Sequence, residues 1–357
     1  MSEPRTLSAP IGVDLMITRR CNLTCLHCSA SADQFEGDDL TTKDLLTLVA
    51  ELSRHKVLRL ALTGGEPLLH PDFFTIASAV IDHRMALQIN TNATLVSPEI
   101  VDKLASLRRR PFISVSVDGV TAGTHDRIRG AGSFERVMSG VRLLTAAGLR
   151  VRPFVVVSRL NYHELPAIVD FCASLGVAEV FLSTPVSTGR ALCYSDEMAL
   201  GADAMRDLLE GTLEVLRKTP TLLRGPWVDM AKLYDDLKHG RALSKSTERI
   251  FTNCGGGRTQ LAIACDGTVA PCQMAFRYRA GNIRTTPFGD VWRHSPVLAH
   301  VRQCQGRPLD SIPGCEGCRW QSACAGPCPA TGVNLTGHWP SAGTLCLKDV
   351  AAAACCD

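Results

Sequence analysis

The sequence predicts an α/β protein: a partial (β/α)6 barrel, similar to an incomplete TIM barrel, followed by a small cysteine-rich domain. Two observations support this fold class. Between residues 12 and 218, runs of apolar and β-branched residues alternate six times with amphipathic stretches, and most cysteines lie in the C-terminal part. Repeated βα units favour a parallel sheet covered by helices, and six units are two short of the eight that close a barrel.

Each of the six units contributes one strand and one helix. The strands are predicted at residues 12–18, 57–63, 86–91, 112–118, 151–157 and 178–184. The helices are predicted at residues 42–54, 73–83, 98–108, 134–147, 162–175 and 202–218. In the first helix, Leu45, Val49 and Leu52 recur at helical spacing behind Thr41, a residue type that caps helix N-termini. The active site of such a barrel should lie at the carboxyl ends of the strands.

The chain length and the cysteine distribution divide the protein in the same way. At about 150 residues per domain, 357 residues allow two domains, and eleven of the sixteen cysteines lie at or beyond Cys254. The expected units are an N-terminal extension (1–11), the barrel (12–225), a connecting segment (226–253), the cysteine-rich domain (254–346) and a tail (347–357). For Cys355 and Cys356 in the tail, the sequence indicates no role.

The composition narrows the class of protein. The chain shows no secretory signal and no run of about 20 apolar residues, although 45% of its residues are hydrophobic. In such a chain, sixteen cysteines favour metal ligands in a reducing cell over disulfide bonds. The net charge of +3 is small for this length. We therefore expect a cytoplasmic protein, with neither membrane insertion nor general binding of nucleic acid.

The most informative segment follows the first strand. Cys21, Cys25 and Cys28 form a C-x3-C-x2-C run. Three thiolates on one short loop can bind three irons of a four-iron cluster and leave the fourth iron open to a second molecule. A zinc loop is the alternative, although tetrahedral zinc needs a fourth protein ligand and usually shows paired C-x2-C knuckles.

Polar motifs follow the next strands, as expected of a functional site. The second strand runs into Gly64-Gly65-Glu66-Pro67, where glycines permit a close backbone approach and a carboxylate can accept hydrogen bonds from an ammonium group. Candidates after the third and fourth strands are Asn92, Ser116, Asp118 and Arg129. Each of these residues also has an ordinary explanation in a turn, a cap or a surface charge.

Together, the cysteine run and these motifs resemble those of the radical S-adenosylmethionine (radical SAM) enzymes. The resemblance implies that Cys21, Cys25 and Cys28 hold a [4Fe-4S] cluster whose open iron binds SAM. It also implies the following SAM contacts: Gly64, Gly65, Glu66 and Pro67 at the methionyl amine, Ser116 and Arg129 at the carboxylate, Asp118 near the ribose, and Asn92 in the same site. His27 stands where the family usually has an aromatic residue against adenine, but a partly exposed loop histidine is equally consistent with the sequence.

The C-terminal cysteines resemble those of the SPASM domain, an extension that holds two auxiliary iron–sulfur clusters, expected to be [4Fe-4S]. The pattern is C-x12-G-x4-C from Cys254 to Cys272, then C-x2-C-x5-C-x3-C from Cys315 to Cys328, then Cys346. The resemblance assigns Cys315, Cys318, Cys324 and Cys346 to the distal cluster, and Cys254, Cys272 and Cys328 to the proximal one. The fourth proximal position is left to Cys265, to Cys304 or to an open iron. A hairpin turning at Asp266-Gly267 would carry both Cys265 and Cys272.

The resemblance implies an enzyme that reductively cleaves SAM and uses the resulting 5′-deoxyadenosyl radical to abstract hydrogen from a substrate carbon. Most relatives of this architecture modify a ribosomally made peptide, so a peptide is the expected substrate. The alternative is a sugar, nucleoside or other small metabolite, modified by a dehydrogenase, epimerase or diol dehydratase reaction. Haem-pathway side-chain chemistry is a further, less favoured possibility.

Three further expectations concern partners and catalysis. A flavodoxin or ferredoxin is expected as electron donor. Only twenty residues precede Cys21, so we expect either that a separate protein presents a leader peptide or that the substrate has no leader. Gln273 stands where the sulfatase maturases carry an aspartate, which argues against that activity. Cys193 follows the sixth strand and is the candidate hydrogen donor to a substrate radical, although a free cysteine is often simply a packed apolar residue.

Overall fold

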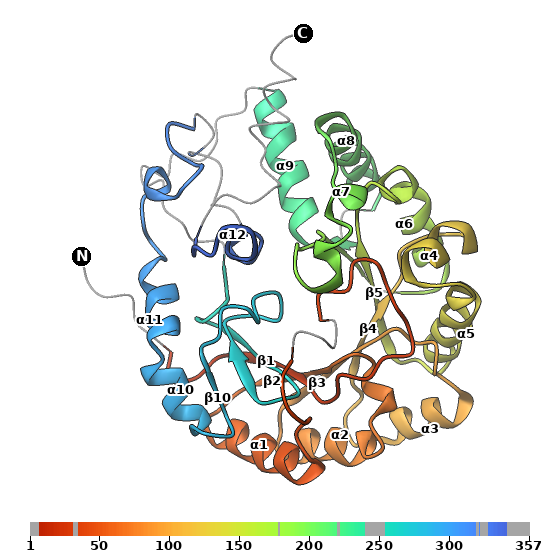
Figure 1. Cartoon of the computed structure of the whole chain (residues 1–357). Helices are drawn as coiled ribbons and strands as arrows, with labels where there is room; N and C mark the ends of the chain where they lie inside the picture. Colours follow the sequence, from red (N-terminus) through yellow and green to blue (C-terminus); the bar gives the residue numbers. More distant parts are fainter. Residues whose placement is uncertain are drawn as a thin grey trace.

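The computed structural model shows a curved sheet with helices around its outer face (Figure 1). It describes residues 7–30, 35–177, 179–219, 222–239, 254–318, 321 and 328–340. The sheet has ten strands in the order β10-β9-β8-β1-β2-β3-β4-β5-β6-β7. Strands β1 to β7 are parallel to their neighbours, as repeated βα units require.

The six predicted strands are confirmed, with ends shifted by a few residues. They are β1 (Gly12–Met16), β2 (Arg59–Thr63), β3 (Ala86–Thr91), β4 (Phe112–Ser116), β5 (Arg150–Val156) and β6 (Val180–Ser183). A short strand, β7 (Leu223–Arg224), extends the sheet beyond β6. The partial-barrel fold predicted from the sequence is therefore correct.

The helices of the six units also lie where the sequence placed them. They are α1 (Thr42–Arg54), α2 (Phe73–Asp82), α3 (Pro98–Ser106), α5 (Ser133–Ala146), α6 (Leu165–Ser174) and α8 (Ala202–Lys218). Thr41 caps α1 and forms a capping box with Asp44, and Ser97 caps α3. Two further helices, α4 (Ala122–Arg129) and α7 (Ser195–Met198), were not predicted. Short 3-10 turns cover Pro67–Leu69, Tyr162–Glu164, Gly189–Leu192 and Leu309–Ser311.

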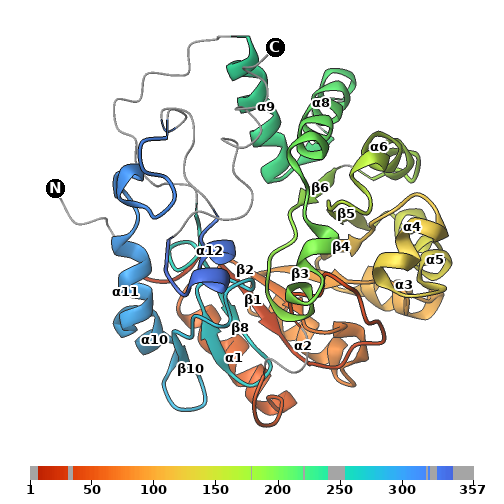
Figure 2. The same ribbon diagram turned by 45° about the horizontal axis from the view of Figure 1, so that its top comes forward.

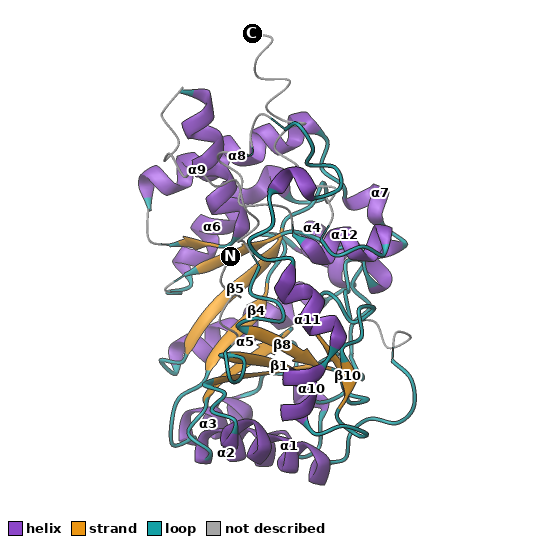
Figure 3. Ribbon diagram, turned by 90° about the vertical axis from the view of Figure 1, so that its left-hand side faces the viewer, coloured by secondary structure: helices purple, strands orange, loops and turns teal. Residues whose placement is uncertain are grey.

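Alternation along the strands gives the sheet two different faces. Leu60 and Leu62 of β2, like Ile113 and Val115 of β4, belong to the main apolar core between sheet and helices. Figure 3 shows α1, α2 and α3 against one side of the strands. Residues between these apolar positions, such as Ser114, face a cavity instead. The incomplete barrel thus keeps a polar inner wall.

The C-terminal cysteine-rich part continues the same sheet. Strand β8 (Gln260–Ile263) pairs in parallel with β1, and β9 (Thr268–Ala270) pairs antiparallel with β8, so the predicted hairpin is confirmed. Gly267 forms its turn with a φ of 89°, a conformation that favours glycine. Pairing with β8 covers the edge that β1 would otherwise expose.

The remaining elements flank the two ends of the sheet (Figure 2). The residues predicted to connect the two parts include α9 (Pro226–Lys238), whose Trp227 Nε1 donates to the Ser183 carbonyl at 2.9 Å. The C-terminal part adds β10 (Gly281–Asn282), α10 (Phe288–His294), α11 (Pro296–Gln303) and α12 (Pro329–Thr336). Within the described ranges, no helix has both the length and the apolar character needed to cross a bilayer.

Candidate functional site

The thiols of Cys21, Cys25 and Cys28 lie on the wall of one cavity of about 760 Å³. The loop that carries them follows β1, and the cavity is also lined by residues of β2 to β6 and β8. The motifs after the strands therefore meet at the carboxyl end of the sheet, as a barrel requires.

Gly65 and Glu66 fix the thiol loop through backbone hydrogen bonds, and Gly64 allows its close approach. Gly65 N donates to the Thr18 carbonyl at 2.9 Å, and Glu66 N donates to the Arg20 carbonyl at 2.8 Å. A Cβ atom on Gly64 would lie 2.4 Å from the Thr18 oxygen, and one on Gly65 would lie 2.3 Å from the Arg20 oxygen. The glycines thus allow close contact with the segment entering Cys21, while their backbone also faces the cavity.

The Glu66 carboxylate is turned away from the cavity and fully buried. Its Oε1 accepts from Leu68 N at 3.1 Å and Thr91 Oγ1 at 2.7 Å, and its Oε2 accepts from Asn92 N at 2.7 Å. Burial raises the pKa of Glu66 to about 7, against the effect of these hydrogen bonds. In this structure the Glu66 side chain joins β2 to β3 and does not present its carboxylate to an ammonium group in the cavity. Pro67 does not line the cavity either.

The surroundings of the three thiols fit an iron–sulfur cluster. Asn92 Nδ2 lies 4.0 Å from Cys21 Sγ, and Arg129 Nη1 lies 3.7 Å from Cys25 Sγ. Partial burial raises the pKa of Cys21 to about 11, so the free thiol keeps its proton at neutral pH and would lose it on binding iron. Among the described residues, no three Cys, His or acidic side chains converge tightly enough for a single metal ion. A four-iron cluster needs no such convergence, because each thiolate binds a different iron.

Asp118, Arg129 and His27 form one buried network beside this loop. Asp118 Oδ2 accepts from Arg129 Nε at 2.6 Å and lies 2.7 Å from His27 Nε2, while Oδ1 accepts from Val156 N at 2.8 Å. Burial alone would raise the pKa of Asp118, but Arg129 and His27 hold it below its ordinary value. His27 and Arg129 line the cavity and Asp118 does not, so the predicted contact of Asp118 with a ribose is not available in this conformation.

Of the two remaining predicted residues in the barrel, Ser116 lines the main cavity and Cys193 does not. Ser116, at the end of β4, lines the cavity together with the three thiols. Cys193 does not line it: this residue is exposed, at the end of the turn formed by Gly189–Leu192. From that turn Arg190 reaches the cavity instead, and its Nη1 donates to the Cys25 carbonyl at 2.9 Å. Cys193 thus neither lines the cavity, as a hydrogen donor to a substrate radical would, nor packs in the core.

Three C-terminal cysteines, Cys254, Cys272 and Cys328, lie within electrostatic range of one another. Burial, followed by the Cys254 and Cys328 thiols, raises the pKa of Cys272 well above its usual value. These are the three residues that the SPASM resemblance assigns to the proximal cluster. Cys315 packs with Cys254 against Leu309 and Ile312, and the backbone N of Cys318 donates to the Cys315 carbonyl at 3.3 Å. Cys324, Cys346, Cys355 and Cys356 lie outside the described residues.

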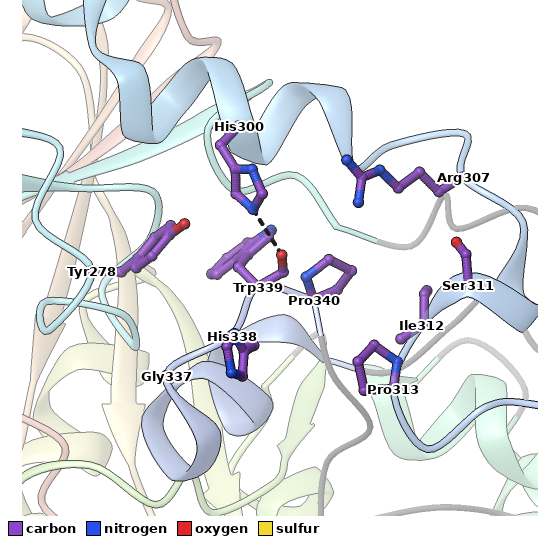
Figure 4. A pocket seen from close by; sticks show the side chains of 10 residues that line it. All are labelled: Tyr278, His300, Arg307, Ser311, Ile312, Pro313, Gly337, His338, Trp339 and Pro340. Atoms are coloured by element: carbon purple, nitrogen blue, oxygen red, sulfur yellow. Dashed lines mark hydrogen bonds between the residues drawn. The ribbon is translucent and has the colours of Figure 1, made fainter.

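The two candidates for a fourth proximal ligand have different surroundings. Cys265 is buried beside Met16 and Phe276, and burial with the hydrogen bond to Asp39 raises its pKa to about 12. Cys304 Sγ lies 3.6 Å from His300 Nε2 and 3.4 Å from the Trp339 carbonyl oxygen. His300 and Trp339 line a second, smaller cavity of about 280 Å³ (Figure 4). Cys265 is therefore directed away from the group of three, whereas Cys304 belongs to the apolar cluster against which Cys254 and Cys272 pack.

Apart from Arg129, the arginines that line the main cavity were not predicted from the sequence. Arg152 of β5 lines the main cavity between the rings of Phe112 and Phe181, at 4.5 and 5.1 Å from their centroids. Arg59 of β2 donates to Gln88 Oε1 at 2.8 Å and lies 3.8 Å from Asp14. A charged residue within an otherwise apolar strand, such as Arg152 in 151–157, was the available signal.

The comparisons with known proteins agree with this geometry. The model of the radical SAM superfamily matches residues 15–172, and the model of an iron-sulfur cluster-binding domain, SPASM, matches residues 254–319. The AdoMet-dependent heme synthase of Methanosarcina barkeri is 32% identical, over 95% of this chain and 97% of that protein. The chain belongs to the radical SAM superfamily. It is a radical SAM enzyme with a SPASM domain, as the sequence predicted.

Other relatives of this radical SAM enzyme carry different names. Mycofactocin maturase MftC of Mycobacterium tuberculosis is 29% identical, over 94% of this chain and 83% of that protein. The crystal structure of Streptococcus suis SuiB bound to precursor peptide SuiA superposes with a TM-score of 0.74 at 19% identity, covering 95% of this chain and 76% of SuiB. That similarity shows a common fold.

Proposed function

We propose that this radical SAM enzyme modifies a substrate that carries a carboxylate, and that the substrate is a ribosomally made peptide. The observation that carries the proposal is the composition of the main cavity wall. Its described lining contains five arginines, namely Arg19, Arg59, Arg129, Arg152 and Arg190, but one acidic residue, Asp14. Guanidinium groups match the planar geometry of a carboxylate and stay charged at any working pH.

The arginines differ in how fully their charge is already paired. Arg19 and Arg129 each lie 2.6 Å from a carboxylate oxygen, of Asp39 and Asp118 respectively. Arg152 lies 3.5 Å from Glu179, and its Nε is buried without a partner. Arg190 has no carboxylate partner among the described residues. Arg152 and Arg190 therefore keep hydrogen-bond donors that can bind an anionic ligand in addition to SAM.

The likeness to mycofactocin maturase over most of both chains supports a peptide as the ligand. A second candidate is a tetrapyrrole, favoured by the 32% identity to an AdoMet-dependent heme synthase. Both classes carry carboxylates, so the arginine-lined wall suits either. Tailoring of a sugar or nucleoside finds less support, because neutral sugars offer the arginines no anion.

In the proposed mechanism, each residue set has a separate task. Cys21, Cys25 and Cys28 hold the cluster, and the backbone of Gly64 and Gly65, with Asn92, Ser116, Arg129 and His27, binds SAM. When bound, the reduced cluster and SAM supply a 5′-deoxyadenosyl radical. Met16, Phe154, Val186 and Phe276 give the cavity apolar surface that excludes water. Arg152 orients the substrate by its carboxylate.

The proposal also includes partners and location. A flavodoxin or ferredoxin would supply the electron, and a separate protein would present a leader peptide if the substrate has one. The cysteine-rich chain would work in the reducing cytoplasm, where thiols remain free to bind iron.

The test uses anaerobically reconstituted enzyme with SAM, dithionite and one of two probes. One is a synthetic precursor peptide of the mycofactocin type, and the other is a porphyrin with four propionate side chains. A mass change in the peptide, with peptide-dependent formation of 5′-deoxyadenosine, supports the proposal. A change in the porphyrin alone moves the assignment to the second candidate, and no change in either contradicts both.

A pair of variants tests the arginine wall with whichever probe reacts. Arg152→Gln should lower product formation by about tenfold or more, since a charge-assisted hydrogen bond contributes about 1.5–3 kcal/mol. Arg217→Gln, which removes an exposed arginine on α8, is the control and should leave product formation unchanged. Equal activity in both variants would exclude a role for Arg152 in substrate binding.

A further inference from the structure

Asp118 uses both of its carboxylate oxygens inside the protein and has no exposed surface. Arg129 Nε and His27 Nε2 share Oδ2, and Val156 N binds Oδ1. Asn161 Nδ2 also donates to the Asp118 backbone carbonyl at 3.0 Å. Both carboxylate oxygens of Asp118 are therefore occupied by protein groups, and the carboxylate can orient those groups.

Arg129, which is held by Asp118, also contacts the thiol loop. The residue is 5% exposed, and its Nη1 lies 3.7 Å from Cys25 Sγ. The Cys25 thiol in turn lies 3.8 Å from the Arg129 carbonyl oxygen, and Leu26 N donates to the Ile128 carbonyl at 2.9 Å. The end of α4 is thus bound to the loop by backbone and side chain, which holds one cation at a cluster thiol.

We infer that Asp118 and Arg129 form a charge pair that sets the reduction potential of the cluster held by Cys21, Cys25 and Cys28, with Asp118 as the positioning residue for Arg129. The inference rests on the cluster site and not on the proposed substrate. Reduction adds one negative charge to a cluster, so a nearby cation favours the reduced form and a nearby anion opposes it. Both charges act strongly because the site is buried and poorly screened.

The inference predicts that variants of Asp118 and of Arg129 shift the midpoint potential of the cluster in opposite directions. Asp118→Asn removes the anion and leaves the Arg129 charge uncompensated, so the midpoint potential of the cluster should rise. Arg129→Gln removes the cation from the Cys25 thiol, so the midpoint should fall. Arg129→Lys retains the charge and should lie between Arg129→Gln and wild type. A structural role alone predicts no such order, because the variants would all weaken the same contact.

The experiment is a redox titration of the reconstituted holoenzyme followed by electron paramagnetic resonance. The signal that changes on addition of SAM identifies the cluster with the open iron, and iron content verifies its assembly. Asp126→Asn is the matched control, since this carboxylate lies on the same helix but binds Gly132 N, Ser133 Oγ and Phe134 N. Its midpoint should equal that of the wild type.

Shifts of opposite sign in Asp118→Asn and Arg129→Gln, with none in Asp126→Asn, would support the inference. Shifts of the same sign, or no shift in either variant, would overturn it. If Asp118→Asn does not retain the cluster, the comparison of Arg129→Gln with Arg129→Lys decides, because equal midpoints in those two variants would also overturn it. None of these readouts depends on turnover of a substrate.

Discussion

The two thiol groups of this enzyme are held in different ways. The N-terminal thiols lie on a loop fixed by charged and polar groups, with Arg129 beside Cys25 and Asn92 beside Cys21. The C-terminal thiols of Cys254 and Cys272 pack instead against an apolar cluster that includes Val186, Ala275 and Trp339. The first site is thus surrounded by charged and polar groups, whereas two thiols of the second pack against apolar side chains.

This difference matches what each site must do. The N-terminal thiols open onto the 760 Å³ cavity, where a cluster with a free iron can meet SAM. The C-terminal part contributes Gln273, Met274 and Phe276 to the same cavity wall, and β8 joins it to β1. The two sites are therefore chemically distinct but mechanically joined by one sheet.

The largest effect is expected when the cysteine ligands of one site are replaced and those of the other are kept. A Cys21/Cys25/Cys28→Ala variant should lose SAM cleavage entirely, and its iron should fall from about twelve to about eight per chain. A Cys254/Cys272→Ala variant should lose iron but keep SAM cleavage with dithionite as reductant. Mössbauer spectroscopy and quantification of 5′-deoxyadenosine measure the two effects. Zinc in place of iron in the C-terminal part, or about four irons in the wild type, would remove the basis of the comparison.

Much of the N-terminal half could be predicted because its signals are local. Apolar periodicity located the six strands and six helices, and loop spacing located the three thiols. Helix α4 escaped because its buried face consists of His125, Ile128 and Arg129, which gives almost no apolar period. Helix α9 does carry a spaced apolar set, including Trp227, Ala231 and Tyr234, so its signal was present in a segment treated as a connection.

What could not be predicted depends on contacts between distant segments. The pairing of β8 with β1 depends on the free edge of the sheet. The inward position of the Glu66 carboxylate depends on the hydrogen-bond donors of Thr91 and Asn92. The spacing of Cys265 and Cys272 on one hairpin suggested a shared cluster. Cys265 and Cys272 lie just beyond the ends of the two strands, however, and Cys265 points to Asp39 from the early part of the chain.

A smaller effect is expected on protein stability, through the buried carboxyl group of Glu66 beside the N-terminal site. Burial raises the pKa of Glu66 to about 7, from an ordinary value of 4.5. Between these values the folded protein keeps the proton and the unfolded chain has lost it, so stability should fall as pH rises through this window. Glu66→Gln does not titrate and should lack this part of the slope. The amide would also oppose the donors at one carboxylate oxygen, costing about 1–3 kcal/mol.

Urea unfolding of the cluster-free, reduced protein between pH 5 and pH 8 measures both consequences. Glu99→Gln is the matched control, because this exposed carboxylate on α3 pairs with Lys103 at 2.7 Å on the surface. It should change neither the stability nor its pH dependence appreciably. A Glu66→Gln variant with the wild-type pH slope would show that Glu66 is ionised throughout this range.

The smallest effect tests the boundary of the C-terminal site. Cys265 and Cys272 lie on the same hairpin, but the structure places only Cys272 with Cys254 and Cys328. Cys265→Ser should therefore keep the full iron content and lower stability by about 1 kcal/mol, since the hydroxyl can still donate to Asp39. Cys272→Ser should lose the iron of the proximal cluster. If Cys265→Ser lost that iron as well, the hairpin would have to turn Cys265 toward the cluster on metal binding, and the group of three would not be the complete protein ligand set of this site.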